Sequence, residues 1–386
     1  MKKYLDVIKR ELEIWRKRPV YFLGSIVVML FCTIFYLTFL GDGVPSKLPI
    51  GVVDYDNSSL TRNFIRQLNS TQLGEVIMYD DYASARKDME TGEITSICVL
   101  PEGMYADVQA QRKPEFTFYV NTLYFLGGSL AYKDILTMIN LTSGAVKRQV
   151  LRMKGMSEYA IMGQLRPVDI DIHMIGNPTM NYGAYLANMM LPGVLQMVIV
   201  ILVIYSLGTE LKYGTSRHLL EISGGKIMPA VGGKMALYTL LFTSLGFSLM
   251  LLLYWVMGFP LKGSLALMLL DMFLLVIASE AVGIVIIGCV PVLRFALSIG
   301  ALYSVMAFSL TGFTLPVDAF PAAIRGISEI FPLRHYYLFY VQNGIFGTGF
   351  AGVWKEIVHL MLFQLLPFLV LLRLKNAYIY QNYPKQ

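Results

Sequence analysis

Six long apolar segments dominate this sequence, and each has the length of a helix that crosses a lipid bilayer. The first, Val20–Leu40, contains no charged residue, and at 1.5 Å per residue it can span the ~30 Å hydrocarbon core of a membrane. The other five are Ala184–Leu207, Met235–Met257, Ser264–Val290, Phe295–Phe313 and Val353–Leu372. Only 15% of the residues are charged, against about 25% in soluble domains. We therefore expect an α-helical polytopic membrane protein with six transmembrane helices.

The charges beside these segments predict the orientation of the chain. Lys and Arg gather in residues 1–19, 208–234, 291–294 and 373–386 and are sparse in the alternate short connections. Because loops rich in Lys and Arg stay in the cytoplasm, both termini are expected there, with 375–386 as a cytoplasmic tail. The net charge of +6 follows from this clustering and indicates no nucleic-acid partner.

Residues 1–19 are expected to form a helix that lies in the cytoplasmic membrane surface. Leu5, Ile8, Leu12 and Trp15 recur at spacings of three and four, so they share one helical face. Charged residues occupy the other faces, which suits an interfacial helix. The alternative is an amphipathic helix packed on soluble protein. The following span, 20–40, is too long for a cleaved signal peptide and is interpreted as an anchor.

Residues 41–182 are polar and long enough to form a domain of their own. Short β-rich runs at Pro49–Asp54, Ile94–Leu100 and Glu115–Val120 alternate with helical patterns at Ser58–Leu68, Tyr82–Thr91 and Leu126–Met153. The sequence therefore predicts an α/β domain inserted between the first two spans, outside the cytoplasm. It shows no catalytic or metal-binding constellation there, and His173 is interpreted as structural.

Residues 183–374 are expected to hold the other five spans, with two connections that exceed simple loops. The segment 208–234 contains a short helical pattern with the pair Leu219-Leu220 and is interpreted as the contact for a cytoplasmic partner. An inert interfacial loop is the alternative. The segment 314–352 is expected to re-enter the outer leaflet, with a surface loop as the alternative. Its apolar runs are punctuated by Pro316, Pro321 and Pro332.

Two acidic residues fall inside the apolar segment Ser264–Val290. Asp271 and Glu280 are nine positions apart, which places them on opposite faces of a helix and excludes one paired-carboxylate site. Asp271 is expected to reach interfacial water. Glu280 lies at mid-depth, where it belongs either to a substrate path or to a hydrogen bond that locks helices together. Its candidate partners are Gln196, His359 and Gln364.

The three cysteines suggest no disulfide and no metal site. Cys32, Cys98 and Cys289 are far apart in the sequence, and two of them lie inside apolar segments. We therefore expect no catalytic residue, no metal and no cofactor in this chain.

The chain resembles the type 2 permeases, the membrane subunits of ATP-binding-cassette exporters, over nearly its whole length. The outer domain is similar to the subgroup with a large domain between the first two spans, through Ile50-Gly51-Val52-Val53-Asp54 and Val99-Leu100-Pro101-Glu102-Gly103. The last outer loop resembles the family's re-entrant region, through Gly312-Phe313, Pro316-Val317, Phe320-Pro321 and Phe331-Pro332-Leu333-Arg334-His335-Tyr336. The cytoplasmic segment looks like the coupling segment, through Glu210, Gly214, Thr215, Leu219, Leu220 and Gly233-Lys234. It departs from the family pattern at Ser216-Arg217 and Ser223-Gly224-Gly225.

This resemblance implies a half-transporter of a bacterial inner membrane, driven by a separate ABC ATPase subunit that carries ATP and Mg²⁺. It also implies a dimer with a second permease copy or paralogue, and in this subgroup often a periplasmic adaptor protein. Membrane lipids are further expected contacts.

No phosphate-binding loop of the form G-x-x-x-x-G-K-[ST] occurs in the chain, so we expect it not to be an enzyme that hydrolyses ATP by that route. The function expected is the permease subunit of an ATP-driven exporter of a hydrophobic or amphipathic substrate, such as a drug or lipid. The alternatives are a membrane signalling receptor with an outer sensor domain, and a membrane enzyme that uses Asp271, Glu280 or His359. The scatter of polar residues argues against the enzyme.

Overall fold

The computed structural model describes residues 2–39, 41, 43, 47–71, 74–110, 112, 114–123, 125–165, 173, 175–177 and 181–380. The chain divides into two compact units. One unit, here called the bundle unit, consists of Met1–Gly41 and Met174–Gln386, and the other, the sheet unit, of Asp42–His173. The last six residues of the tail proposed at 375–386 lie outside the described part, as does Leu40 at the end of the first predicted span.

The bundle unit contains the six apolar helices that the sequence predicts. Among the described residues, six helices are long and apolar enough to cross a membrane: Pro19–Phe39, Tyr182–Lys212, Ile227–Val256, Leu265–Cys289, Leu293–Leu310 and Phe350–Tyr380. In detail these are α2 (Val20–Phe22), η1 (Leu23–Val27) and α3 (Val28–Phe39), then α9 (Tyr182–Lys212), α11 (Ile227–Leu251) with η2 (Leu252–Val256), α12 (Leu265–Cys289), α13 (Leu293–Leu310), and α16 (Phe350–Leu362), η5 (Phe363–Leu365) and α17 (Leu366–Tyr380). The prediction of a polytopic helical protein is confirmed.

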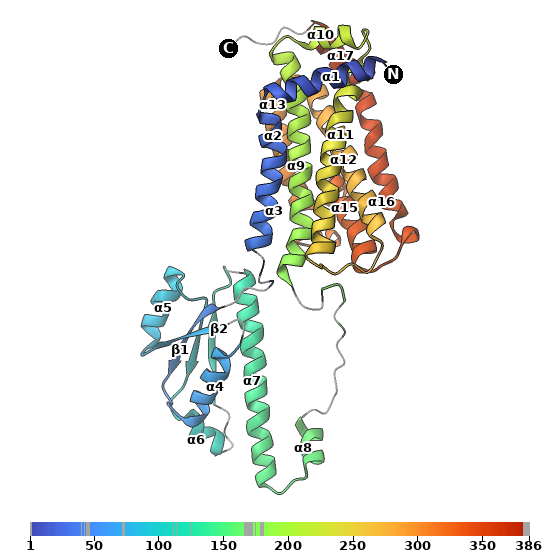
Figure 1. Ribbon diagram of the computed structural model, residues 1–386. Helices are drawn as coiled ribbons and strands as arrows, with labels where there is room; N and C mark the ends of the chain where they lie inside the picture. The colour runs from blue at the N-terminus through green and yellow to red at the C-terminus, as the bar shows by residue number, and fades with distance from the viewer. Residues whose placement is uncertain are drawn as a thin grey trace. The chain divides into compact units, whose positions relative to one another are not determined.

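Helices α9 and α12 form the centre of the bundle. They are the most buried of the six, and α12 packs against α9, α11 and α17 while α9 also contacts α3 and α13. Figure 1 shows the helices side by side along one direction. The outer helices leave large apolar side chains exposed, such as Phe31, Leu240 and Leu369, which is expected of surfaces that face lipid.

Helix α1 (Lys2–Lys17) lies across one end of the bundle, beside α10 (Ser216–Ile222) and the end of α17 (Figure 1). We call this the α1 end and its opposite the far end. The predicted helix at 1–19 is confirmed. Leu5 and Leu12, from the apolar stripe that the sequence predicts to face the membrane surface, are exposed. Val7 and Glu11 are buried on the side that packs against α11, where Glu11 meets a buried cation.

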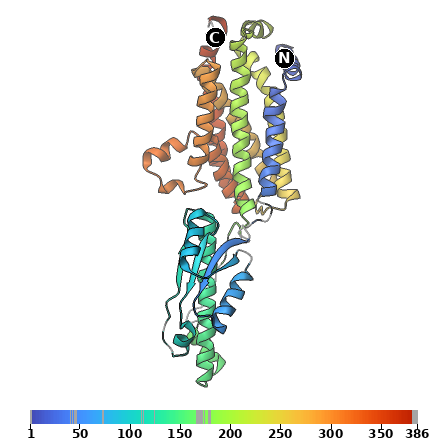
Figure 2. The same cartoon turned by 90° about the vertical axis from the view of Figure 1, so that its left-hand side faces the viewer.

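At the far end, the connection between α13 and α16 has two parts. Its first part, with η3 (Val317–Ala319) and α14 (Ala322–Ser328), projects from the side of the bundle in Figure 2, and most of its residues are exposed. Its second part, α15 (Pro332–Phe339) and η4 (Tyr340–Ile345), packs into the bundle. Leu333, Tyr336 and Phe339 there are fully buried.

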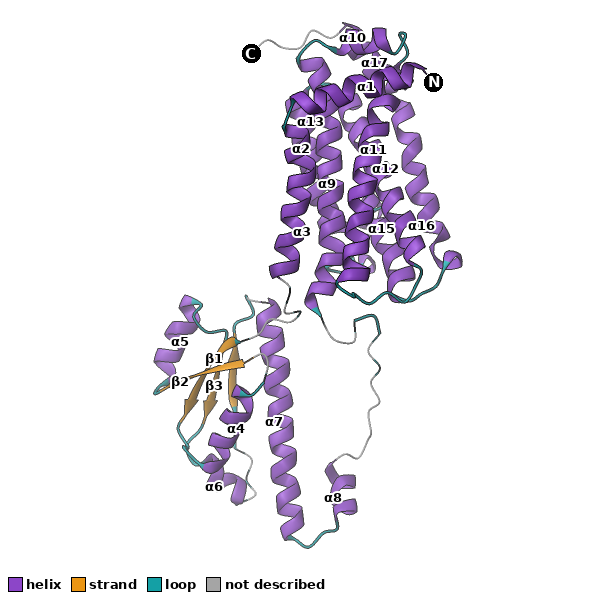
Figure 3. Ribbon diagram, viewed as in Figure 1, coloured by secondary structure: helices purple, strands orange, loops and turns teal. Residues whose placement is uncertain are grey.

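The sheet unit is an α/β fold around four strands (Figure 3). The strands β1 (Leu48–Asp54), β2 (Gly74–Tyr79), β3 (Ser96–Leu100) and β4 (Thr117–Val120) have the order β2-β1-β3-β4. β1 pairs in parallel with β2 and β3, with Ile50 opposite Val76 and Ser96, and β4 is antiparallel to β3. The strands predicted near β1, β3 and β4 are confirmed.

The helices of the sheet unit are α4 (Ser59–Asn69), α5 (Tyr82–Thr91), α6 (Met104–Gln109), α7 (Phe125–Met153) and α8 (Glu158–Leu165), of which α8 packs on α7. The other helices leave neither face of the sheet uncovered. Phe64 of α4 and Ile135 of α7 pack with Val52 on one face, and Ala85 of α5 packs near Val53 on the other. The helices predicted at 58–68, 82–91 and 126–153 are confirmed.

Candidate coupling site at the α1 end

A buried group of charged side chains joins α1, α9 and α11. Glu210, in the last turn of α9, accepts hydrogen bonds from both terminal nitrogens of the Arg10 guanidinium, at 2.8 Å and 2.9 Å. The Lys234 ammonium of α11 lies 2.7 Å from Glu210 Oε1 and 2.7 Å from Glu11 Oε2. Two residues of the coupling segment expected from the sequence, Glu210 and Lys234, are therefore ion-paired with each other.

Neutral side chains complete the environment of Glu11. Its Oε1 accepts hydrogen bonds from Tyr238, at 3.0 Å, and from Ser206, at 3.2 Å. The indole of Trp15 donates in turn to the Tyr238 hydroxyl, at 3.1 Å. We call Arg10, Glu11, Glu210 and Lys234 the ion network.

The ion network carries no net charge and is almost fully shielded from solvent. Two positive and two negative groups meet, and their side chains are exposed by 15% for Arg10, 3% for Glu210, 1% for Lys234 and 0% for Glu11. Burial lowers the pKa of Arg10, but the hydrogen bonds and charge of Glu210 outweigh it and raise that pKa above its ordinary value. Removing one member of such a group leaves a buried charge without its partner, which typically costs about 3–5 kcal/mol.

A tight turn leads from α9 to α10. Gly214 has φ of +66°, a left-handed conformation that costs little only for glycine. The Thr215 hydroxyl donates to Glu210 Oε2, so the turn is tied to the ion network. The guanidinium of Arg18 lies 4.6 Å from the ring centre of Tyr213, which ties α1's end to the same turn.

Helix α10 docks on the bundle through its apolar pair and through α17. Leu219 is fully buried and Leu220 is 5% exposed. Ser216 donates to the backbone oxygen of Tyr378, at 2.9 Å, and Arg217 to that of Ile379, at 3.2 Å. Of the expected coupling residues, Glu210, Leu219 and Leu220 thus face the bundle. The exposed positions are Tyr213, Gly214, Thr215, Arg217, His218 and Glu221.

The two acidic residues of α12 occupy separate environments. Asp271 is fully buried, and neither of its carboxylate oxygens has a hydrogen-bond partner among the described residues. The expectation that Asp271 reaches interfacial water is wrong, because helices packed on several sides of α12 leave this side chain fully buried. Glu280 is 5% exposed and accepts a hydrogen bond from Thr239, at 2.7 Å.

The surroundings of Glu280 differ from those expected. Its hydrogen-bond partner is Thr239 of α11, which is none of the three partners predicted from the sequence. Gln364 lines the same cavity of about 250 Å³ as Glu280. Gln196 has both side-chain polar atoms buried without a hydrogen-bond partner in the described part of the chain, and His359 lies near His335 instead.

The three prolines of the outer connection have different positions. Pro316 and Pro321 are exposed and precede η3 and α14, whereas Pro332 is buried and begins α15. Proline is favoured at the first position of a helix because it lacks an N–H that would find no partner there. The three prolines therefore mark helix starts and line no common site.

Sequence reasoning found Glu210 but missed Arg10 and Glu11 as its companions. The available signal was Glu11 itself, since it shares a helical face with Val7 and thus predicts a buried counter-charge. The identity of that counter-charge depends on the tertiary fold.

The family model and the curated relatives that match this chain are all described as transport proteins. A family model described as "ABC-2 family transporter protein" matches residues 20–373. Two curated relatives, from Escherichia coli (strain K12) and Shigella flexneri, are both described as "Inner membrane transport permease YhhJ". Each is 25% identical to this chain over 320 residues, which cover 81% of this chain and 81% of the relative.

Proposed function

Because this chain belongs to the ABC-2 transporter family, we propose that it is the permease subunit of an exporter powered by a separate ATPase. In this proposal the chain lies in a bacterial inner membrane with both termini in the cytoplasm, so that the α1 end faces the ATPase. The sheet unit is then extracytoplasmic. The concentration of Lys and Arg in 1–19 and 208–234 supports this orientation.

The observation that carries the proposal is the connection of α10 to the ion network. The α9–α10 turn bonds to Glu210 through Thr215, and Glu210 holds Arg10 and Lys234. A force applied to α10 would therefore reach α1, α9 and α11 through short ionic contacts, and α17 through Ser216. Rigid contacts of this kind transmit a displacement because packed elements move as units.

In this mechanism, the ATPase contacts the exposed face of α10 and of the turn before it. ATP-driven closure of the ATPase would push α10 and tilt the attached helices between inward-open and outward-open states. ATP and Mg²⁺ act on the partner subunit. A second permease copy or paralogue completes the transporter, and a periplasmic adaptor is a further candidate partner for the sheet unit.

A cavity between α12, α13, α15 and α16 supports an apolar substrate. Its volume is about 360 Å³, and most of its lining is aliphatic or aromatic, including Val282, Ile286 and Phe363. Pockets of this size and character bind drug-sized molecules. We propose a hydrophobic or amphipathic cargo, such as a drug or lipid, that moves outward along this side of the bundle.

Purification of the chain from its host in lipid nanodiscs tests the proposal. We expect an ATPase to co-purify at equal stoichiometry and ATP-driven export after reconstitution. Charge reversal on the exposed face of α10, Glu221→Lys, should weaken ATPase binding about tenfold, or ~1.4 kcal/mol. The matched control is Lys262→Glu, an exposed position at the far end.

The absence of any ATPase, together with a co-purifying kinase, would overturn the proposal in favour of the receptor. If Glu221→Lys and Lys262→Glu bind the ATPase equally well, the ATPase does not contact this face of α10.

A further inference from the structure

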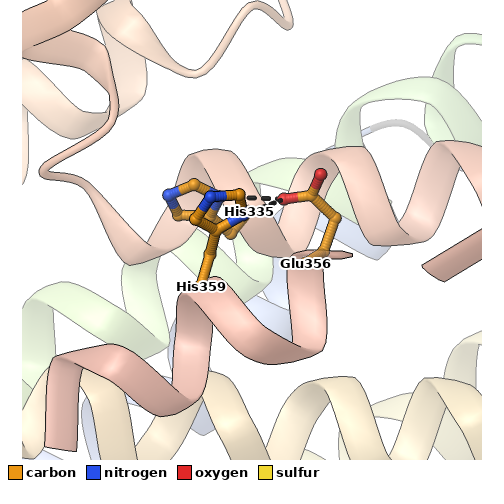
Figure 4. Close-up of side chains that lie close together, drawn as sticks. All are labelled: His335, Glu356 and His359. Atoms are coloured by element: carbon orange, nitrogen blue, oxygen red, sulfur yellow. Dashed lines mark hydrogen bonds and ion pairs between the residues drawn. The ribbon is translucent and has the colours of Figure 1, made fainter. Parts of the chain in front are cut away.

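Three potential metal ligands converge near the far end of the bundle. His335 comes from α15, and Glu356 and His359 come from successive turns of α16 (Figure 4). One ligand atom from each residue, all within 4.8 Å of one another, can be selected. Figure 4 shows the two imidazole rings beside each other, with the Glu356 carboxylate pointing at them. The rings are stacked with their centres 4.7 Å apart.

The hydrogen bonds of His335 require a proton or a metal ion between His335 and Glu356. Its Nε2 lies 3.1 Å from the backbone oxygen of Glu329, and a carbonyl oxygen only accepts, so Nε2 carries the hydrogen. In a neutral imidazole the other nitrogen, Nδ1, then bears a lone pair. That lone pair lies 2.8 Å from a carboxylate oxygen of Glu356, which bears lone pairs as well. Two such acceptors approach each other only with a proton or a metal ion between them.

The position of His359 favours the metal ion over the proton. Its Nδ1 lies 3.7 Å from the same Glu356 oxygen. Three potential ligand atoms therefore lie close together, whereas a hydrogen bond would involve only two of them. Ligands 2.0–2.1 Å from a tetrahedral zinc ion are about 3.4 Å apart. The two separations from the Glu356 oxygen, 2.8 Å and 3.7 Å, lie on either side of that value, and the three ligand atoms all lie within 4.8 Å of one another.

We propose that His335, Glu356 and His359 bind one zinc ion. Two imidazoles and a carboxylate are ligands that suit Zn²⁺. The hydrogen bond from His335 Nε2 to a backbone oxygen is the usual support of a metal-bound histidine, because it fixes the tautomer and the ring orientation.

Charge and access also suit a divalent cation. Arg334 is paired with Glu329, at 2.8 Å, so this nearby positive charge is already balanced. Among the described residues, Glu356 is then a buried carboxylate that forms ion pairs with no Lys or Arg, and Asp271 lies within electrostatic range of it. The His359 side chain is 47% exposed and lines the apolar cavity together with His335, which leaves a path for the ion and room for a fourth ligand.

Zinc binding by the full chain tests the assignment independently of transport. The protein in nanodiscs is stripped with a chelator, equilibrated with ZnCl₂, and its bound zinc is counted by mass spectrometry. We expect one zinc per chain, and at least tenfold weaker binding in Glu356→Gln and His359→Gln. Because His359 is half-exposed, its substitution should leave the fold intact. His173→Gln, in the sheet unit, is the matched control and should bind zinc as the wild type does.

His359→Cys separates a metal ligand from a hydrogen-bonding role. A thiolate binds zinc but does not replace the imidazole in stacking or hydrogen bonding, so zinc binding should be retained in this variant. The proposal is overturned if the wild type binds no more zinc than His359→Gln, which would leave a proton between His335 and Glu356. It is equally overturned if His173→Gln loses the zinc instead.

Discussion

Arg10 and Glu210 form a bidentate ion pair, with nitrogen–oxygen distances of 2.8 Å and 2.9 Å, although they are 200 residues apart in the sequence. Arg10 belongs to the helix that lies across the end of the bundle, and Glu210 to the central helix α9. The N-terminal helix is therefore held to the bundle by a buried charge as well as by apolar packing. This pairing makes α1 a structural part of the site at the α1 end.

Removing the carboxylate of Glu210 should destabilise the bundle strongly. Glu210→Leu leaves Arg10 and Lys234 with only the charge of Glu11, and we expect a loss of about 3–5 kcal/mol in the free energy of unfolding. Adding Lys234→Met should recover part of this loss, because one positive charge then balances one negative charge. Denaturant unfolding in nanodiscs measures both variants. Glu221→Leu, an exposed position on α10, should change stability by less than about 0.5 kcal/mol, and equal losses in both single variants would contradict the prediction.

The close approach of α1 to α11 depends on Gly233. A Cβ atom at this position would lie 2.7 Å from Val7 Cβ and 3.2 Å from the backbone oxygen of Tyr4. Gly233→Val should therefore push α1 outward and cost about 1–3 kcal/mol. The fluorescence of Trp15, observed with the other two tryptophans replaced by Phe, should shift to the red as its packing on Tyr238 is lost. Gly326→Val, where a Cβ meets nothing within 4 Å, should leave the emission unchanged, and an unshifted spectrum in Gly233→Val would refute this account.

The turn before α10 should tolerate only residues that accept a left-handed backbone. Apart from its two chain neighbours, no described residue has an atom within 4 Å of a Cβ at Gly214, so the cost of Gly214→Ala arises from its φ, about 1 kcal/mol or more. Gly214→Asn should cost less, because Asn adopts this conformation more readily. Thermal unfolding of the two variants against wild type measures the difference. If Gly214→Ala and Gly214→Asn lower the unfolding temperature equally, backbone strain is not the cause of the loss in stability.

The apolar helices could be predicted from the sequence, but their contacts could not. A charge-free run such as Val20–Leu40 carries its own signal, because about 20 apolar residues need no particular partner to enter a bilayer. The pairing of Arg10 with Glu210 depends on which helices meet. The burial of Glu11 depends on tertiary contacts in the same way, because Glu11 is stable inside only with Lys234 opposite it.

Local patterns also explain which smaller elements were missed. The strand β2 begins with Gly74 and exposes several of its side chains, as an edge strand does, so its apolar alternation is weak. The His335 group was missed because its members come from two helices, although Glu356 and His359 stand at the helical spacing of three. Asp271 could be placed on α12 from the sequence, but its enclosure arises from side chains of other helices.

Glu280 should be replaceable by a neutral isostere but not by a cation. Thr239 is its single hydrogen-bond donor within the described part of the chain, and an amide oxygen can accept that bond as a carboxyl oxygen does. We expect Glu280→Gln to change the free energy of unfolding by less than about 1 kcal/mol, and Glu280→Lys to cost several kcal/mol at this depth. A large loss in Glu280→Gln would show that the carboxyl group itself holds the helices together. If Glu280→Gln is stable yet fails to transport, the substrate-path interpretation gains support.

The sheet unit offers a pH-dependent test of its own core. The Tyr79 hydroxyl donates to Asp88, at 2.7 Å, and burial together with this hydrogen bond raises the pKa of Tyr79 to about 12. An unfolded tyrosine has a pKa near ~10, so the folded state holds the proton more tightly. The resulting stability is complete below about pH 10 and is lost as the pH rises towards about 12.

Tyr79→Phe removes this contribution, which we expect to be about 1 kcal/mol at pH 8. The segment 47–165 lies within one compact unit with apolar clusters on both faces of its sheet, and we expect it to fold when expressed alone. Denaturant unfolding of this segment and of its Tyr79→Phe variant should differ at pH 8 and converge as the pH passes from 10 to 12. Tyr105→Phe, at an exposed position, controls for general effects of alkali. A difference between wild type and Tyr79→Phe that stays constant over this range would exclude the bond to Asp88 as its source, because only the wild type loses the Tyr79 proton and with it this bond.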